Sequence, residues 1–383
     1  MDPSISAVGS WSGGRFMRFG EAISEQRLSA LLVPDDQIAT VISADVYGEG
    51  AADALLGRAL AGCERERYCL VGAIGHDFYS APRAGAKGYP RFSDPRLRGP
   101  ERYRDYLEHA ARASLERLGQ ERFDLLLLHN PDRRGYRSDA VWEALAQLRE
   151  LGLTEKLGVA PGPANGFTLD LIACLERFSE LIDWAMIIFS PLEPWPGELV
   201  LPAARAAGVR LITRVVDYGG LFFGDIDAQA RFCERDHRAF RPAGWVEQGL
   251  QRIAQMAPIA EAHGLTPLQL ACAFNLAQAP IACVAPTLIQ ERSAQARAIE
   301  SKRAELAALA SLQAAGALAL SADEIAALRA IGDNTGCMAL KGASPEHSGE
   351  EAPDRWELDE ELRQAAARWA IDPERALVRS ALV

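Results

Sequence analysis

The chain has 383 residues and a formal net charge of −11; its hydrophobic residues make up 49% and its charged residues 24%. No apolar run approaches the roughly 20 residues that span a bilayer, and the basic residues are interleaved with acids instead of forming the stripe that binds nucleic acid. We therefore expect a globular protein that takes a small-molecule substrate and has neither a nucleic-acid nor a membrane partner. The start of the chain, Met1–Ser4, has no signal-peptide pattern, which predicts a cytoplasmic location. The sequence gives no indication of oligomeric state.

Short apolar runs alternate along the whole chain with amphipathic segments. The runs are about four to eight residues long and apolar at consecutive positions, which is typical of strands buried on both faces. Helices are predicted between them, for example over Tyr103–Leu118, Ala140–Leu151 and Leu268–Ala277. The predicted strands are Ile5–Gly9, Ile38–Ala44, Tyr68–Ile74, Phe123–Leu128, Leu157–Ala160, Trp184–Phe189, Val209–Val216 and Ile281–Leu288.

This alternation predicts an α/β fold with a parallel sheet and right-handed crossovers. A doubly wound open sheet is the main competitor, but no G-x-G-x-x-G follows an early strand. We therefore predict a (β/α)₈ TIM barrel over residues 1–330 with long loops at its mouth. Residues 331–383 are predicted to form a C-terminal extension that packs on the barrel. In such a barrel the active site lies at the C-terminal ends of the strands.

Polar residues follow several predicted strands and are candidates for that site. Asp45 and Tyr47 follow the second strand, His76 the third, His129 the fourth and Asp217 the seventh. A metal site built from His76, Asp77 and His129 is an alternative, but nothing in their spacing fixes a ligand geometry, and we predict no metal. The seven cysteines stand singly, as expected of reduced thiols.

Over roughly the first 300 residues, several segments resemble the aldo-keto reductase family. The stretch Ala44–Gly48, followed by Leu56–Leu60, is similar to the family's D-T-A-x-x-Y-G…S-E-x-x-L-G-x-A-L pattern. Ser114–Gly119 and Asp124–Asp132 resemble its S-L-x-R-L-G…D-L-x-L-x-H-x-P-D block. Leu151–Val159 and Gly208–Phe222 resemble the fifth strand and the seventh strand with its cofactor-side loop. The order and spacing of these segments support the barrel.

The resemblance implies reversible hydride transfer between NADP(H) and a carbonyl. In the family a tyrosine donates the proton, a lysine paired to an aspartate lowers the pKa of that tyrosine, and a histidine orients the carbonyl. Tyr47 and His129 match the tyrosine and the histidine, whereas the aspartate falls on Ile42 and the lysine on Ala73. The chain has only four lysines, and we expect only the loop residues Lys87 and Lys341 to be able to reach the mouth, because Lys156 precedes the fifth strand at the opposite end.

These replacements have a physical consequence. A free tyrosine titrates near 10, a nearby ammonium lowers that pKa, and burial alone raises it. Without the lysine, Tyr47 is predicted to be a poor proton donor, and loss of a matched general acid typically costs about 10²–10⁴ in rate. An aspartate kept without its lysine would be a buried, unpaired charge, so the joint replacement indicates a rebuilt site.

The positions that the resemblance assigns to the cofactor are also altered. The serine–asparagine pair after the fifth strand is Ala160-Pro161, and the groups expected to hold the nicotinamide amide fall on Met186 and Ser190. Arg214 is at the position that covers the nicotinamide ring. The phosphate-contact run P-G-A-x-x-x-x-Q is matched only loosely, and its candidate residues are Thr287, Gln290 and Arg292. Whether NADP(H) binds stays open.

We predict an oxidoreductase similar to aldo-keto reductases that acts on a small carbonyl or alcohol with NADP(H) through an altered tetrad. One alternative is a non-redox lyase, dehydratase or isomerase in which Tyr47 and His129 perform acid–base chemistry, assisted by Asp45, His76 or Asp217. The other is a catalytically silent binding protein. The fold alone cannot decide, because this barrel supports many chemistries.

Overall fold

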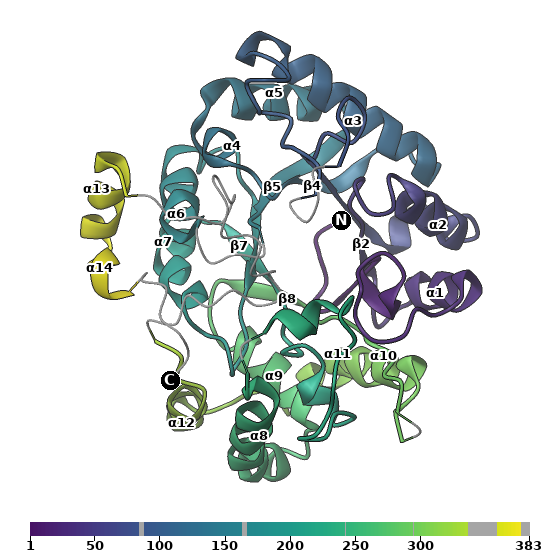
Figure 1. Cartoon of the computed structure of the whole chain (residues 1–383), viewed down its shortest axis with the longest axis vertical. Helices are drawn as coiled ribbons and strands as arrows, with labels where there is room; N and C mark the ends of the chain where they lie inside the picture. Colours follow the sequence, from purple (N-terminus) through teal and green to yellow (C-terminus); the bar gives the residue numbers. More distant parts are fainter. Residues whose placement is uncertain (84–87, 163–166, 242, 294, 336–357, 377–383) are drawn as a thin grey trace.

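The centre of the molecule is one eight-stranded parallel sheet with the strand order β1 to β8. The computed structural model describes residues 1–83, 88–162, 167–241, 243–293, 295–335 and 358–376. A parallel bridge between Ser6 and Val284 joins the first and last strands and closes the sheet into a barrel (Figure 1). The predicted (β/α)₈ barrel is confirmed. Its strands are β1 (Ala7–Gly9), β2 (Thr40–Ile42), β3 (Cys69–Ile74), β4 (Phe123–His129), β5 (Thr154–Ala160), β6 (Trp184–Ile188), β7 (Arg210–Arg214) and β8 (Ile281–Ala285).

Helices surround this barrel (Figure 1). The helix predicted over Tyr103–Leu118 has those bounds, because Gly119 follows it in the left-handed conformation (φ 64°) that ends helices. In the described part of the chain, no helix is long and apolar enough to cross a membrane. The helices are α1 (Glu25–Leu32), α2 (Ala51–Leu60), α3 (Tyr103–Leu118), α4 (Arg133–Arg137), α5 (Asp139–Glu150), α6 (Thr168–Arg177), α7 (Leu201–Ala206), α8 (Trp245–Ala262), α9 (Pro267–Leu276), α10 (Ile299–Ala307), α11 (Leu309–Ala314), α12 (Ala322–Ile331), α13 (Glu360–Arg368) and α14 (Pro373–Ala376).

Beyond the ring, α13 packs against the outer side of α6 (Figure 1). Arg137 of α4 supports this contact through an ion pair of 2.5 Å with Asp359, the residue that caps α13. The predicted division at residue 330 stays a proposal.

Two apolar clusters account for the core. The larger lies between the strands and the helices, and the smaller fills the barrel itself, with Trp184, Leu127 and Ile212 completely buried. Because side chains fill such a barrel, it is a packed core and not a pore. A ligand is therefore confined to one of its ends.

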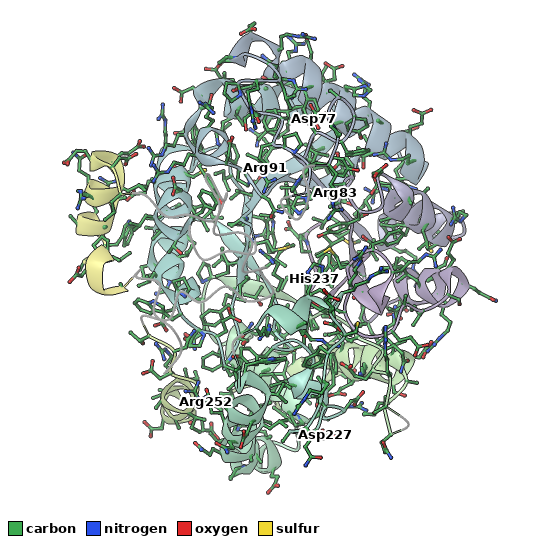
Figure 2. All side chains as sticks on the ribbon, viewed as in Figure 1. Asp77, Arg83, Arg91, Asp227, His237 and Arg252 are labelled. Atoms are coloured by element: carbon green, nitrogen blue, oxygen red, sulfur yellow. The ribbon has the colours of Figure 1, made fainter. Side chains whose placement is uncertain are left out.

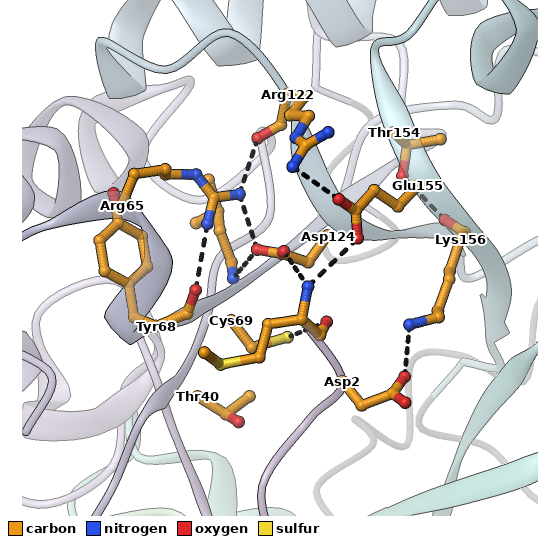
Figure 3. A network of polar contacts seen from close by, with 12 residues as sticks. Asp2, Thr40, Arg65, Tyr68, Cys69, Arg122, Asp124, Thr154, Glu155 and Lys156 are labelled. Carbon is orange, nitrogen blue, oxygen red and sulfur yellow. Dashed lines mark hydrogen bonds and ion pairs between the residues drawn. The ribbon is translucent and has the colours of Figure 1, made fainter. Parts of the chain in front are cut away.

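Polar contacts close the N-terminal end of the barrel (Figure 3). The ammonium group of Met1 contacts Asp124 Oδ1 at 2.5 Å and Glu155 Oε2 at 3.1 Å. Lys156 Nζ donates to Asp2 Oδ1 at 2.5 Å in the same region. This network occupies one end of the barrel. The predicted site residues lie at the other end, the mouth.

Candidate active site

Tyr47 lies in the turn that follows β2, above the filled interior of the barrel. Its N–H donates to the Ala44 carbonyl at 3.0 Å, and its half-buried side chain packs against the interior cluster. Within that cluster Ile42 and Ala73 are 1% and 5% exposed. The floor beneath Tyr47 is therefore apolar at both of these positions.

His129 is the last residue of β4 and contacts Tyr47. The two ring centroids are 5.8 Å apart and the ring planes meet at 84°. His129 is buried, and its Nδ1 has no hydrogen-bond partner among the described residues. Burial, followed by the positive charges of Arg91 and Arg214, lowers the pKa of His129 to about 3. The imidazole is thus neutral near pH 7, with one nitrogen that donates and one that accepts.

The hydroxyl of Tyr47 is also held in its neutral form. Burial raises the pKa of Tyr47 above its ordinary value, and the positive charge of Arg214 offsets part of that rise. Tyr47 is therefore a hydrogen-bond donor whose proton leaves reluctantly.

Arg214 ends β7 and reaches across to the loop after β5. Its Nη2 donates to the carbonyl oxygens of Pro161 at 2.8 Å and Gly162 at 2.9 Å. The next residue, Val215, has a φ of 62°, which is strained for a β-branched side chain. Burial lowers the pKa of Arg214, whereas the nearby Tyr47 and Glu193 raise it. The guanidinium charge is thus fixed over the barrel mouth.

His76 forms a second polar group beside His129, with ring centroids 4.9 Å apart. Its Nε2 lies 3.1 Å from Asn130 Nδ2 and its Nδ1 lies 3.1 Å from Arg91 Nη1. Arg91, which is labelled in Figure 2, returns to this position through an antiparallel bridge with His76. Burial and the charge of Arg91 hold the pKa of His76 well below its usual value, so His76 too is neutral.

The backbone brings these two strand ends together. At Gly75, which follows β3 with a φ of 150°, a Cβ would lie only 2.8 Å from the His129 carbonyl oxygen. Asn130, which follows His129, has a φ of 46°. The close approach requires glycine at position 75, and it holds the His76 and His129 rings in contact.

A comparison with protein families identifies the chain. A model of the Aldo/keto reductase family matches residues 27–333. This chain belongs to the aldo/keto reductase family. "Aldo-keto reductase yakc [NADP(+)]" of Schizosaccharomyces pombe is 24% identical over 72% of this chain and 77% of its own length. Similar solved structures are a glycerol dehydrogenase from Gluconobacter oxydans (TM-score 0.63, 20% identity, 86% of this chain and 92% of that one) and the holo form of an aldo-keto reductase from Bacillus halodurans (TM-score 0.59, 20% identity, 91% and 96%).

Ile42 and Ala73 are the residues that the sequence resemblance places at the family's aspartate and lysine positions. Ile42 and Ala73 lie in the buried interior cluster, as described above. Lys302 is fully buried in an ion pair of 2.5 Å with Asp225 and donates to the Ile289 carbonyl, so it is committed elsewhere. Lys156 lies at the opposite end of the barrel. The other two lysines, Lys87 and Lys341, lie outside the described residues.

The residues predicted to hold the cofactor differ in their burial and in their hydrogen-bond partners. Met186 is buried in the barrel interior, and Ser190 is buried with no partner for its hydroxyl among the described residues. The Thr287 N–H donates to Asp217 at 2.7 Å. The Gln290 amide accepts from Arg27 and the Ile299 N–H and donates to carbonyls of residues 291 and 297. Arg292 is exposed.

The other two predicted assisting residues are Asp45 and Asp217. Asp45 is fully buried, and burial raises the pKa of its carboxyl group. The negative charge of Asp53 in α2 raises this pKa further, and the positive charge of Arg117 in α3 lowers it. Asp217 accepts hydrogen bonds from the N–H groups of Thr287 and of Gly220 at 2.9 Å, and joins the loops after β7 and β8. The contacts of Asp217 are those of a structural residue, whereas both carboxyl oxygens of Asp45 are buried with no hydrogen-bond partner among the described residues. The roles proposed for Asp45 and Asp217 stay predictions.

Asp77, the remaining member of the suggested metal site, is engaged by Arg98 and by the Ser80 N–H. Within the described ranges, no group of three His, Cys, Asp or Glu side chains could hold a metal ion. The sequence reasoning missed Arg91, because no local pattern shows that residue 91 returns to the end of β3. The proximity of Arg214 to Tyr47 was also missed, although Arg214 itself was predicted at the mouth.

Proposed function

We propose that this protein is an NADP(H)-dependent oxidoreductase that interconverts a small carbonyl compound and its alcohol. The observation that carries the proposal is the contact between Tyr47 and a neutral, buried His129 at the mouth of a barrel of this family. Both groups can donate a hydrogen bond to one carbonyl oxygen, which polarises it. The named relatives support the choice of cofactor, because one carries NADP(+) in its name and a Klebsiella pneumoniae aldo/keto reductase (TM-score 0.53, 20% identity, 86% of this chain and 91% of that one) was solved in complex with NADP and acetate.

The mouth has residues that fit this cofactor at each end. The buried hydroxyl of Ser190, which has no partner in the part of the chain that the structure describes, suits the nicotinamide carboxamide. The exposed Arg292 suits a phosphate. Met186 and Gln290 do not contribute, because one is apolar and the amide of the other is already engaged. When bound, NADP(H) supplies or takes the hydride.

The chain's own residues move the proton. Tyr47 gives its proton to the carbonyl oxygen in the reduction direction, and a tyrosinate forms over an apolar floor. Arg214 is the cation that stabilises this tyrosinate, in the absence of a lysine at position 73. A guanidinium that is also hydrogen-bonded to two carbonyls is a weaker aid than a dedicated ammonium, so we expect slow turnover. Reduction, which uses the protonated hydroxyl, should vary little with pH around neutrality, whereas oxidation of the alcohol, which uses the tyrosinate, should be faster above neutral pH.

A titration of NADPH fluorescence combined with one substitution tests the proposal. The wild type is expected to bind NADPH and reduce short aldehydes slowly. Tyr47→Phe should keep NADPH binding and lose at least 10²-fold in kcat. Tyr68→Phe is the matched control, because its hydroxyl contacts Gln120 at 2.9 Å and the residue lies at the start of β3, at the other end of the barrel. No NADPH binding at millimolar concentration would contradict the proposal.

One observation favours a second candidate, a non-redox lyase, dehydratase or isomerase. The apolar pair Ile42 and Ala73 removes the usual means of tuning Tyr47 for reduction, but Tyr47, His129 and Arg214 still form a donor set suited to an enolate oxygen. On this reading Tyr47→Phe abolishes an activity that does not depend on NADPH, and the NADPH titration shows no quenching.

A further inference from the structure

The loop after β6, residues 189–196, is held by residues from the C-terminal part of the chain. It carries Ser190, whose buried hydroxyl has no hydrogen-bond partner among the described residues. Near the other end of this loop, Trp195 contacts two residues that lie 139 and 181 positions further along the sequence. The position of the loop therefore depends on segments that follow the barrel.

Asn334, which follows α12, binds the backbone of Trp195 at two points. The Trp195 N–H donates to Asn334 Oδ1 at 2.9 Å, and Asn334 Nδ2 donates to the Trp195 carbonyl at 2.9 Å. Two residues before Asn334, a Cβ at Gly332 would lie only 1.6 Å from the Pro191 carbonyl oxygen, so this close approach requires glycine. The end of α12 thus contacts both the first part of the loop and its last part.

Helix α14 supplies a third contact, to the side chain of Trp195. The indole Nε1 donates to the Ala376 carbonyl at 2.7 Å. Ala376 is the last residue of α14, and the last carbonyls of a helix have no partner inside it. The preceding helix α13 packs on α6 with Leu362 and Ala365 fully buried. The C-terminal extension therefore carries an acceptor that is anchored to the barrel on one side and bound to Trp195 on the other.

The same loop faces the mouth. The Phe189 N–H donates to the Arg214 carbonyl at 3.4 Å, and the negative charge of Glu193 raises the pKa of Arg214. The Glu193 N–H donates to the Ser190 carbonyl at 3.0 Å, so these two residues move together. Prolines at 191, 194 and 196 fix φ within the loop. A displacement at Trp195 is therefore transmitted to Ser190.

We propose that Trp195 is a positioning residue of the cofactor site and that the C-terminal extension acts on this site through it. Asn334 and the Ala376 carbonyl hold Trp195, and Trp195 holds the loop in the form in which Ser190 can bind the nicotinamide carboxamide. This inference rests on the proposed function, because it concerns the residues that place its cofactor. Coupling between two sites is reciprocal: if docking of α14 favours NADPH binding, NADPH favours docking of α14 by the same factor.

Two variants that each lose one indole hydrogen bond test this inference. Trp195→Phe removes the donor to Ala376, and the matched control Trp369→Phe removes an indole donor to Glu176 Oε1 at 2.9 Å, a contact of the extension with α6. Loss of one such bond lowers the binding-competent fraction of the loop by about 2- to 10-fold, and Kd for NADPH, measured by fluorescence, should rise by the same factor. KM for NADPH should rise in parallel while kcat stays unchanged, as for a loss of binding alone. Trp369→Phe should change none of these constants.

A second measurement needs no substitution. Hydrogen exchange of the wild-type chain is followed with and without saturating NADPH, and the amides of residues 189–199 and 371–376 should both exchange more slowly with NADPH. This measurement decides the inference even if Trp195→Phe fails to fold. In addition, Asn334→Asp, which keeps the acceptor for the Trp195 N–H and loses the donor, should raise Kd less than Asn334→Ala.

Three results would overturn the inference and leave the oxidoreductase in place. They are an unchanged Kd for NADPH in Trp195→Phe, an equal rise of Kd in Trp369→Phe, and NADPH binding that leaves exchange in residues 371–376 unaltered. A wild-type protein that fails to bind NADPH would instead overturn the proposed function, and this inference with it.

Discussion

Rebuilding the missing ion pair beneath Tyr47 tests how far the apolar floor limits the site. Ile42 and Ala73 lie on the neighbouring strands β2 and β3, where Ile42 pairs with Val71, and both belong to the interior cluster against which Tyr47 packs. Since the strands are about 4.8 Å apart, an aspartate at 42 and the long side chain of a lysine at 73 can come into contact. The double variant Ile42→Asp/Ala73→Lys thus introduces an ammonium below the Tyr47 hydroxyl.

The expected magnitude follows from the charge that is added. A nearby opposite charge shifts a pKa by about 1–3 units, and a matched general acid contributes about 10²–10⁴ in rate. Because Arg214 already supplies part of this stabilisation, we expect kcat for NADPH-dependent reduction of a short aldehyde to rise by about 10- to 10³-fold. The pH at which oxidation of the alcohol becomes fast should move down toward neutrality, because the added ammonium lowers the pKa of Tyr47. The single variant Ala73→Lys should unfold more easily than the double variant by about 3–5 kcal/mol, because it buries an unpaired charge.

The assay is NADPH oxidation followed by absorbance, together with urea denaturation of each variant. The neutral pair Ile42→Asn/Ala73→Met is the control for shape without charge. A double variant that folds and binds NADPH but reduces the substrate no faster than the wild type would refute the reasoning.

Three further predictions concern the supports of the site. The pKa of His129 is about 3 in the folded protein and about 6.5 in an unfolded chain, so the stability that its neutral form contributes should be full above pH 6.5 and fall as the pH drops toward 3. Linkage gives a loss of about 3 kcal/mol in the free energy of unfolding between pH 8 and pH 4.5. Urea denaturation of His129→Asn should not show this loss. Arg98→Met should cost about 3–5 kcal/mol in urea denaturation, since it removes the positive partner of the completely buried Asp77, and adding Asp77→Asn should restore most of this loss. Gly75→Ala should cost at least about 1 kcal/mol and raise KM, because its Cβ meets the His129 carbonyl, whereas Gly62→Ala, which has open space around it, should change neither.

Each of these predictions has a clear contrary result. A pH profile of stability that is the same with and without His129 would show that this imidazole titrates normally. If Arg98→Met is as stable as the wild type, the buried ion pair with Asp77 contributes nothing. If Gly75→Ala retains the wild-type KM, the contact between the ends of β3 and β4 does not position His129.

The strands could be predicted because they are buried on both faces, and strands of this kind consist of short runs of consecutive apolar residues. The prediction was less accurate where polar residues continue a strand. It began β5 at Leu157, but the strand starts at Thr154, since Glu155 and Lys156 belong to the polar network at the closed end. It extended the last strand to Leu288, but β8 ends at Ala285, because those apolar residues continue into a buried loop.

The site was predicted in part, for reasons that differ between residues. Tyr47 and His129 could be proposed as candidates because each follows or ends a strand within a familiar pattern, and the barrel brings their two rings into contact. Arg91 lies in a long loop with no periodicity, and only its pairing with His76 returns it to the mouth. Arg214 affects the pKa of Tyr47 because the barrel brings the end of β7 close to the turn after β2, and no local sequence pattern predicts this proximity.

The central claim is that Tyr47 stands over an apolar floor and holds its proton tightly. The most direct measurement is an NMR titration of ¹³C-labelled tyrosine, with the Tyr47 signal assigned by comparison with Tyr47→Phe. We predict that Tyr47 ionises above the pH of about 10 at which a free tyrosine titrates. A Tyr47 signal that titrates near pH 7 would contradict the account, because it would show that a cation replaces the missing lysine in full.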